Sequence, residues 1–289
     1  MFASASRTRS RTVPGPGNDG TVNSVSRAQW IELAGAVNVR DVGGLPTADG
    51  GVVANGRLIR ADNLQGLTDD DVRLLVEERG VRTVADLRSW LEVNSEGPGP
   101  MTRQESVAVH NLSLLPEVGR TTDAAADDDA SPGLIVHDEQ DVEPGTNGHR
   151  AAGIYLGYLL DRADSIIAAL RLIAHSDGAV IVHCAAGKDR TGVVVALALA
   201  AVGVEREAVV TDYARTEERL KEVFVRLGAS PTYFDDVAYE GINRHRPRPE
   251  IMRRFLDVVD ERFGGVSRWL EAQGWTADDD AALRGKLLG

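Results

Sequence analysis

One short stretch of this 289-residue chain limits its fold more than any other, the segment AVIVHCAAGKDRTGVVVALALAAVG at positions 179–203. Residues 179–182 are apolar and mostly β-branched, as in a buried parallel strand. Residues 191–204 are apolar over a length that fits only a buried helix. The loop AAGKDR between them directs backbone N–H groups and a helix N-terminus toward the space above Cys184. This strand–loop–helix pattern predicts an anion-binding site.

The residues of the loop indicate a particular chemistry. Five residues separate Cys184 from Arg190, the Cys-x5-Arg spacing typical of cysteine-dependent phosphatases. A helix N-terminus and a neighbouring arginine favour the thiolate, which is the nucleophilic form of cysteine. Arg190 offers a planar fork for two phosphoryl oxygens, and Thr191 can donate a hydrogen bond to the departing sulfur. The expected phosphate-binding residues are Ala185, Ala186, Gly187, Lys188, Asp189, Arg190 and Thr191.

The full string HCAAGKDRTG resembles the loop of the bacterial tyrosine and lipid phosphatases of the HCxxGKDRTG group. The segments NVRDVGGLPT (38–47), VADLRS (84–89) and the C-terminal LLG also resemble that group, in the same order and at similar spacing, so the resemblance covers residue 30 to the end. It implies a cysteine-phosphatase-like fold and a protein tyrosine phosphatase that works through a phosphocysteine intermediate. It also implies activity on phosphoserine, phosphothreonine and phosphoinositides, and export without a signal peptide.

Other interpretations of the loop fit less well. A Walker nucleotide loop needs Ser or Thr after Gly-Lys, but Asp189 follows Lys188. A rhodanese-type loop does not require the GKDRTG ending, and a buried structural cysteine does not require the rest of the string. An arsenate reductase normally uses further thiols, whereas Cys184 is the only cysteine. The alternative kept open is a pseudophosphatase that binds phosphorylated partners without hydrolysing them.

Composition and net charge limit the classes of partner that the chain can bind. With 43% hydrophobic and 26% charged residues, the chain has the composition of a globular protein. The formal net charge of −12 argues against nucleic-acid binding, but loop amides and Arg190 can still hold a phosphate locally. We expect no cofactor and no metal, a monomer in the cytoplasm, no transmembrane segment, and a phosphorylated protein or phosphoinositide as the substrate.

The rest of the chain alternates predicted strands and helices. GGVVANGRLIRA (50–61) predicts a β-hairpin turning at Asn55-Gly56. Thr68 followed by three aspartates predicts the start of a helix that ends at Gly80. VRTVADL (81–87) and residues 107–112 predict strands, and residues 151–175 have helical periodicity. We therefore expect an α/β fold with a mostly parallel central sheet flanked by helices, and a ligand site at the carboxyl ends of the strands.

Domain organisation follows from composition. Residues 1–26 predict a disordered N-terminal tail, and residues 27–289 a single phosphatase domain. The acidic stretch 117–149 predicts a mobile insertion, with Asp127, Asp128 and Asp129 as a solvated run rather than a metal site. By resemblance, residues 210–248 form a helical lid over the site; ordinary core helices are the alternative. With no second cysteine to rescue an oxidised thiolate, such a lid would shield Cys184 from peroxide.

The general acid has three candidates, because none of the four Trp residues forms a Trp-Pro-Asp loop before the cysteine. Asp86 is the first choice, since it matches the strand-end aspartate of the group. Asp189, beside the bound phosphate, is the second, and Asp161 on a helix is the third. A carboxyl group in this role donates a proton to the leaving oxygen and later activates water.

Two further features have both a functional and a structural interpretation. Lys188 adds a second cation to the loop, which suits phosphoinositides, or it pairs with Asp189 or Asp86 and shapes the loop. The Arg40-Asp41 dipeptide before Gly-Gly predicts a turn with a buried pair, or a support behind the phosphate-binding loop.

Overall fold

The computed structural model describes Met1 and residues 29–115, 147–234 and 242–289. The predicted tail over 1–26 and the predicted insertion, apart from its last three residues, lie outside this part of the chain. So do Asp127, Asp128 and Asp129, and the stretch 235–241 of the predicted lid. The remaining predictions fall on described residues.

A mostly parallel sheet forms the centre of the fold. In the described residues its strands lie in the order β1-β2-β3-β6-β4-β5, and β3, β6, β4 and β5 run parallel. The register pairs both Ala61 of β3 and Asp86 of β4 with His183 of β6, so three strands end at the same edge. The strands are β1 Gln29–Trp30, β2 Arg40–Asp41, β3 Leu58–Ala61, β4 Val81–Asp86, β5 Ala108–Asn111 and β6 Ala179–His183.

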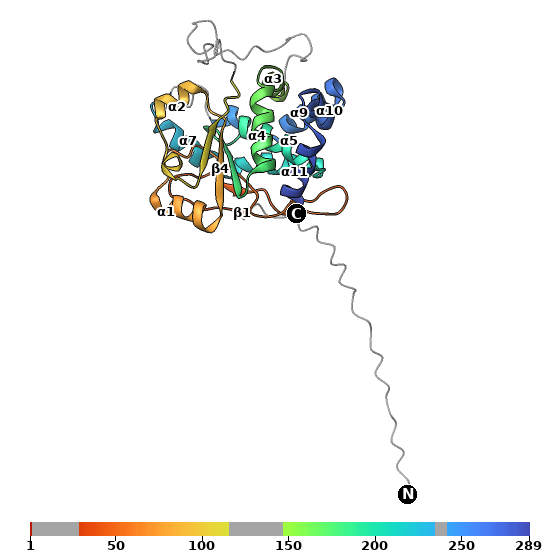
Figure 1. The fold of residues 1–289 in the computed structure, drawn as a ribbon, viewed down its shortest axis with the longest axis horizontal. Coiled ribbons are helices and arrows are strands. Elements are labelled where there is room, and N and C mark those ends of the chain that lie inside the picture. The colour runs from red at the N-terminus through yellow and green to blue at the C-terminus, as the bar shows by residue number, and fades with distance from the viewer. Residues whose placement is uncertain (2–28, 116–146, 235–241) are drawn as a thin grey trace.

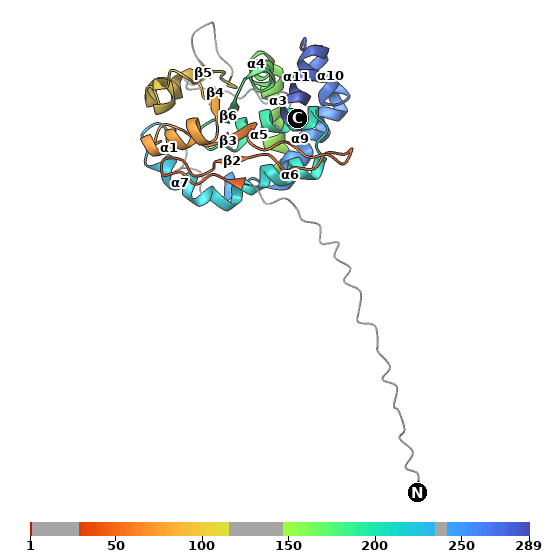
Figure 2. The ribbon, with the colours of Figure 1, turned by 60° about the horizontal axis from the view of Figure 1, so that its bottom comes forward.

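Helices cover both faces of the sheet (Figures 1 and 2). The helices up to and including the one that follows Cys184 are α1 Asp69–Arg73, α2 Trp90–Glu96, α3 Asn147–Asp161, α4 Ala163–His175 and α5 Asp189–Ala201. The helices after α5 are α6 Arg206–Ala214, α7 Leu220–Gly228, α9 Pro249–Phe263, α10 Val266–Ala272 and α11 Ala277–Leu288. Short 3-10 turns occupy Pro100–Arg103, Arg215–Arg219 and Ile242–His245, and a π turn, Leu74–Glu78, continues α1.

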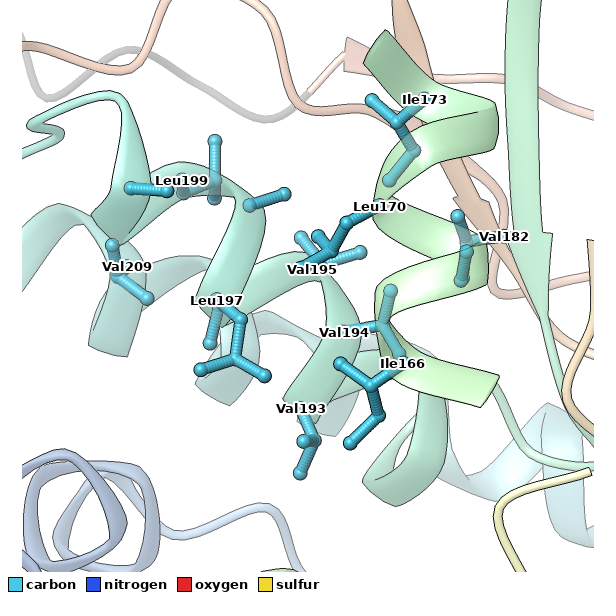
Figure 3. Close-up of a cluster of buried hydrophobic side chains, with 14 of the residues drawn as sticks. Ile166, Leu170, Ile173, Val182, Val193, Val194, Val195, Leu197, Leu199 and Val209 are labelled. Atoms are coloured by element: carbon cyan, nitrogen blue, oxygen red, sulfur yellow. The ribbon is translucent and has the colours of Figure 1, made fainter. Parts of the chain in front are cut away.

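The strand side chains alternate between two apolar clusters, as the period of two requires. Val180 and Val182 of β6 face the larger cluster, which α3, α4, α5, α6, α9, α10 and α11 complete, whereas Ile181 faces the smaller cluster beside α1. Helix α5 is buried on nearly every side, with ten of its 13 residues inaccessible. Figure 3 shows its valines and leucines against Ile166 and Leu170 of α4. This packing fixes the N-terminus of α5 in front of β6.

The predicted fold class is confirmed, and one local prediction, the hairpin over residues 50–61, is wrong. Thr68 caps α1 with its side chain, and Gly80 follows with a φ of 67°, as the sequence indicates. The hairpin over 50–61 does not form, because β3 pairs with β2 and β6 and not with the residues before its turn. The helical stretch 151–175 is divided at Arg162 into α3 and α4. Among the helices of the described residues, none has the length and apolar character needed to cross a membrane.

Candidate active site

Cys184 lies at the carboxyl end of β6, directly before the loop that leads into α5. It is a free cysteine and is only 2% exposed. The ends of β3 and β4 flank it, so the cysteine occupies the edge where open α/β sheets bind ligands. Thr191 in the first turn of α5 is fully buried, and its hydroxyl has no hydrogen-bond partner among the described residues.

Gly187 allows the loop to pass close to the end of β3. Its φ is 67°, a conformation that side chains other than glycine rarely adopt. A Cβ atom at this position would lie 2.5 Å from the carbonyl oxygen of Ala61 and 2.7 Å from the backbone nitrogen of Asp62. The sheet therefore supports the loop from behind, at a distance that only a glycine permits.

Two side chains hold the carbonyl groups of the loop. Asn38 Nδ2 donates to the carbonyl oxygens of Ala186 at 2.9 Å and Gly187 at 3.3 Å, and Arg60 Nη2 donates to the Gly187 oxygen at 2.8 Å. The backbone N–H groups of residues 185–188 have no acceptor within the described part of the chain. Because these two carbonyl groups accept hydrogen bonds from side chains while the N–H groups have no acceptor in the described residues, the loop offers the donors that an anion requires.

A buried charge cluster fixes these supports. Asp212 of α6 accepts from Arg40 Nε at 2.9 Å and from Arg60 Nη1 at 2.5 Å, and all three side chains are nearly inaccessible. Burial alone would raise the pKa of Asp212, but the two guanidinium groups lower it to about 2. Arg40 also donates to Asn38 Oδ1 at 2.7 Å. Arg40 thus supports the loop through Asn38, while Asp41 accepts from two backbone N–H groups of the adjoining turn.

Arg190 is held in place by Glu92, a residue that the sequence analysis did not single out. Its Nη1 lies 2.6 Å from Glu92 Oε2 and its Nη2 lies 2.8 Å from Oε1. Burial opposes the ionised form of Glu92, but Arg190 outweighs it, so the pKa of Glu92 falls below its usual value. Ser89-x-x-Glu92 is a capping box, and this pattern beside a strand end was the sequence signal that could have found Glu92.

Asp86 lies where the sequence predicts, at the end of β4, where it pairs with Arg88 and lies near His183. Arg88 Nη2 lies 2.6 Å from Asp86 Oδ2, and His183 Nε2 lies 3.6 Å from Oδ1. Burial would raise the pKa of Asp86, but the interactions with His183 and Arg88 lower it. Burial also lowers the pKa of His183 to about 4. Asp86 therefore stays ionised and paired beneath the loop.

Asp189 and Lys188 face the other side of the loop. Tyr155 of α3 donates its hydroxyl to Asp189 Oδ1, while Lys188 Nζ lies 3.3 Å from Asp189 Oδ2. Lys188 Nζ also donates to the carbonyl oxygen of His245 at 2.7 Å. The side chain of Asp189 is 37% exposed, unlike that of Asp86. Asp161, the third candidate acid, is the last residue of α3.

The chain after α5 crosses the site at several points. Arg226 of α7 pairs with Asp62 and donates to the carbonyl oxygens of Gly35 and Asn63. Tyr233 is 4% exposed, and burial and the charge of Glu92 raise its pKa above the usual value, against the opposing effect of Arg88 and Arg190. The described residues of the 210–248 segment therefore contact the chain that follows β3 through Arg226, and Lys188 of the loop through the His245 carbonyl.

Metal chemistry has no candidate site in the described ranges. Across residues 29–115, 147–234 and 242–289, no three His, Cys, Asp or Glu side chains gather closely enough to hold a metal ion. The groups around Cys184 are a thiol, an arginine fork, free loop amides and two carboxylates. This set can stabilise a phosphoryl group in transfer between two nucleophiles.

Comparison with known proteins agrees with this geometry. Residues 31–289 match the model of the tyrosine phosphatase family. The triple specificity protein phosphatase PtpB of Mycobacterium tuberculosis is 30% identical over 280 residues, covering 89% of this chain and 99% of that protein. A tyrosine-protein phosphatase of Nostoc commune is 37% identical over 129 residues, covering 40% of this chain and 42% of that protein. The chain belongs to the tyrosine phosphatase family.

Proposed function

We propose that the chain is a protein tyrosine phosphatase that works through a phosphocysteine intermediate on Cys184. The observation that carries this proposal is that Cys184 directly precedes four backbone N–H groups, those of residues 185–188, which have no acceptor among the described residues, and then the N-terminus of α5. An arginine fork already fixed by Glu92 follows in the same loop. These donors suit the three equatorial oxygens of a phosphoryl group in transfer.

In the first step, the thiolate of Cys184 attacks phosphorus and the bond to the substrate oxygen breaks. A carboxylic acid gives its proton to that oxygen, so an alcohol or phenol leaves. In the second step, a water gives its proton to the same carboxylate and attacks phosphorus. The sulfur–phosphorus bond then breaks, releasing inorganic phosphate and the thiolate, which the Thr191 hydroxyl can stabilise.

We assign the acid role to Asp189 ahead of Asp86. A general acid must be protonated when the leaving group departs, whereas Asp86 has a lowered pKa and an ion pair with Arg88. Asp189 is more exposed and is the first residue of α5, directly after the loop. Asp86→Asn and Asp189→Asn separate the two assignments. The acid's variant should lose most activity with poor leaving groups, whereas the other should lose the same factor with all substrates.

We propose a substrate range wider than phosphotyrosine, with phosphoserine, phosphothreonine and phosphoinositides as further substrates. The M. tuberculosis relative is named a triple specificity phosphatase, which supports this breadth. The contacts of Lys188 with Asp189 and His245 favour a role in shaping the loop. If Lys188 also contacts phosphoinositides, Lys188→Ala should lower their hydrolysis relative to that of phosphotyrosine. An unchanged ratio leaves the lysine with the loop-shaping role alone.

Within the predicted lid segment 210–248, residues 210–214 end α6, and Asp212 and Tyr213 there are buried supports of the site. We also propose that the part after α6 is a lid that opens to admit substrate. In its described residues, Tyr233 is buried near Arg190, and Arg226 and the His245 carbonyl bind to the loop side of the sheet. Cys184 is only 2% exposed, and displacement of these groups would open a path for the phosphoryl group. In a folded variant lacking residues 215–248, which keeps Asp212 and Tyr213, peroxide should inactivate Cys184 faster than in the full chain.

Hydrolysis of p-nitrophenyl phosphate tests the proposed function. The full chain should release nitrophenol, and Cys184→Ser should abolish the release without changing the thermal melting point. A folded wild-type protein that binds inorganic phosphate or a phosphopeptide but hydrolyses neither aryl phosphates nor phosphopeptides would instead be a pseudophosphatase.

A further inference from the structure

The hydroxyl groups of two buried tyrosines form a short chain that ends at Asp189. Tyr155 of α3 donates to Asp189 Oδ1, and the hydroxyls of Tyr155 and Tyr213 lie 2.8 Å apart. Tyr213 comes from α6, so three helices contribute to one hydrogen-bonded line. Both tyrosines are 1% exposed. The sequence motifs around the loop do not account for either residue.

The direction of this chain follows from the chemistry of its members. Each phenol has one hydrogen to donate. Tyr155 donates a hydrogen bond to Asp189 Oδ1, so in the contact between the two tyrosines the hydroxyl of Tyr213 is the donor and the oxygen of Tyr155 accepts. Burial and the charge of Asp189 raise the pKa of Tyr155 well above its usual value, which keeps Tyr155 a donor.

The ring of Tyr155 is placed by packing that does not depend on its hydroxyl. Its centroid lies 6.1 Å from that of Tyr158, 6.3 Å from that of Tyr213 and 5.8 Å from that of Phe255. The contacts with Tyr213 and Phe255 are edge-to-face, the geometry that aromatic pairs prefer. A phenylalanine at position 155 can keep these contacts while losing only the hydrogen bond.

Asp189 has contacts from several directions. Its other oxygen, Oδ2, lies 3.3 Å from Lys188 Nζ, and Arg190 follows it in the chain. From α3, the hydroxyl of Tyr158 is close enough for the Asp189 charge to raise its pKa, together with burial. Within this set, Tyr155 is the group that fixes Oδ1. A rotation about the side chain of Asp189 would break that hydrogen bond.

We propose that Tyr155 is a positioning residue for Asp189, and that Tyr213 in turn fixes the hydroxyl of Tyr155. The hydrogen bond holds the carboxyl group at the rotation from which it delivers its proton to the leaving oxygen and later receives one from water. This inference rests on the proposed phosphatase function and on Asp189 as the acid. It predicts that the two tyrosines act on the reaction only through that carboxyl group.

The test measures kcat and KM for two aryl phosphates, one with a good leaving group and one with a poor one. Tyr155→Phe should lower kcat for phenyl phosphate about 10- to 100-fold, the usual effect of a misplaced catalytic group, and change kcat for p-nitrophenyl phosphate by less than about threefold. KM should change little for either substrate. Tyr213→Phe should produce a smaller loss in the same direction.

A double-mutant cycle separates positioning from a structural role. Adding Tyr155→Phe to Asp189→Asn should leave kcat unchanged, because the group that Tyr155 positions is already gone. An equal loss for both substrates, or the same loss in the Asp189→Asn background as in the wild type, would overturn the proposal. If Tyr155→Phe does not fold, the same two criteria apply to Tyr213→Phe. Activity that survives in Cys184→Ser would contradict the proposed function instead, independently of either tyrosine.

Discussion

Glu92 holds the guanidinium of Arg190 with both carboxylate oxygens, at 2.6 and 2.8 Å. The same carboxylate accepts the backbone N–H of Ser89 at 2.7 Å, so the first turn of α2 fixes the direction from which it meets the arginine. The contact uses the two terminal nitrogens of Arg190. Among the described residues the Nε–H of Arg190 has no acceptor, so it can donate to a phosphoryl oxygen. Glu92 thus orients Arg190 for the substrate.

Replacing Glu92 should therefore impair catalysis. We expect Glu92→Gln to lower kcat/KM for an aryl phosphate about tenfold or more, since a bidentate charge-assisted contact becomes a weaker one and Arg190 gains freedom. Steady-state kinetics measure the change. Ser89→Ala is the matched control, because it removes the cap of α2 but leaves the Glu92–Arg190 contact in place. A rise in kcat/KM for Glu92→Gln would mean that the carboxylate competes with phosphate.

The loop should not tolerate a side chain at Gly187. We expect Gly187→Ala to lower kcat/KM about 100-fold, because a Cβ 2.5 Å from the Ala61 oxygen displaces the loop from its donor geometry. Gly56→Ala is the control: Gly56 has a similar φ of 69° but no atom within 4 Å of the added Cβ. It should change stability by about 1 kcal/mol and leave kcat/KM unchanged. Equal activity of the two variants would contradict the support of the loop by β3.

The ion pair between Arg226 and Asp62 should restrain the segment over Cys184. Burial raises the pKa of Asp62, and Arg226 opposes that effect. We expect Arg226→Ala to speed alkylation of Cys184 by iodoacetamide about tenfold, which corresponds to a loss of about 1.4 kcal/mol from the closed state. Arg253→Ala removes an exposed pair with Glu207 and should leave the alkylation rate unchanged. Equal rates in wild type and Arg226→Ala would mean that Arg226 does not control access to Cys184.

His183 should make stability fall with decreasing pH. Burial lowers its pKa to about 4 from a usual value near 6.5, so between these values the unfolded chain binds a proton that the folded chain does not. The free energy of unfolding should thus decrease as pH falls through this window, by about 3 kcal/mol at pH 4. Urea unfolding at pH 7 and at pH 4 measures the difference in free energy of unfolding. In His183→Asn this difference should be smaller than in the wild type by the contribution of His183. The same decrease in wild type and His183→Asn would contradict a contribution of His183 to the pH dependence of stability.

Local sequence patterns predict the parts of this structure that depend on near neighbours. The strand, loop and helix around Cys184 form as expected, because residues 179–204 hold a complete buried unit in one segment. The cap at Thr68 and the helix stop at Gly80 follow the same logic. The strand Leu58–Ala61 does not depend on near neighbours in this way, because it is buried on both faces and pairs with β6, more than 100 residues away. A hairpin signal next to it could not reveal that partner.

The site residues also divide into those that a local motif predicts and those that only the fold brings together. Cys184 and Arg190 belong to one motif and share one loop, so their spacing was informative. Glu92, Tyr155 and Asp212 reach the site from other helices, and their contacts are separated by 98, 34 and 152 residues along the chain. A charged or aromatic residue on a helix has no pattern that identifies its distant partner. Only the packing of α2, α3 and α6 around the sheet brings these side chains to the loop.

The phosphocysteine intermediate offers the most direct test of the proposed mechanism. Wild-type protein is mixed rapidly with an aryl phosphate, quenched by denaturation within one turnover and examined by mass spectrometry after proteolysis. The peptide that contains Cys184 should carry one phosphoryl group, whose amount decays as free phosphate appears. Cys184→Ser should yield neither free phosphate nor a phosphorylated peptide. Turnover by a wild-type enzyme whose Cys184 never carries phosphate, or turnover by Cys184→Ser, would contradict the account.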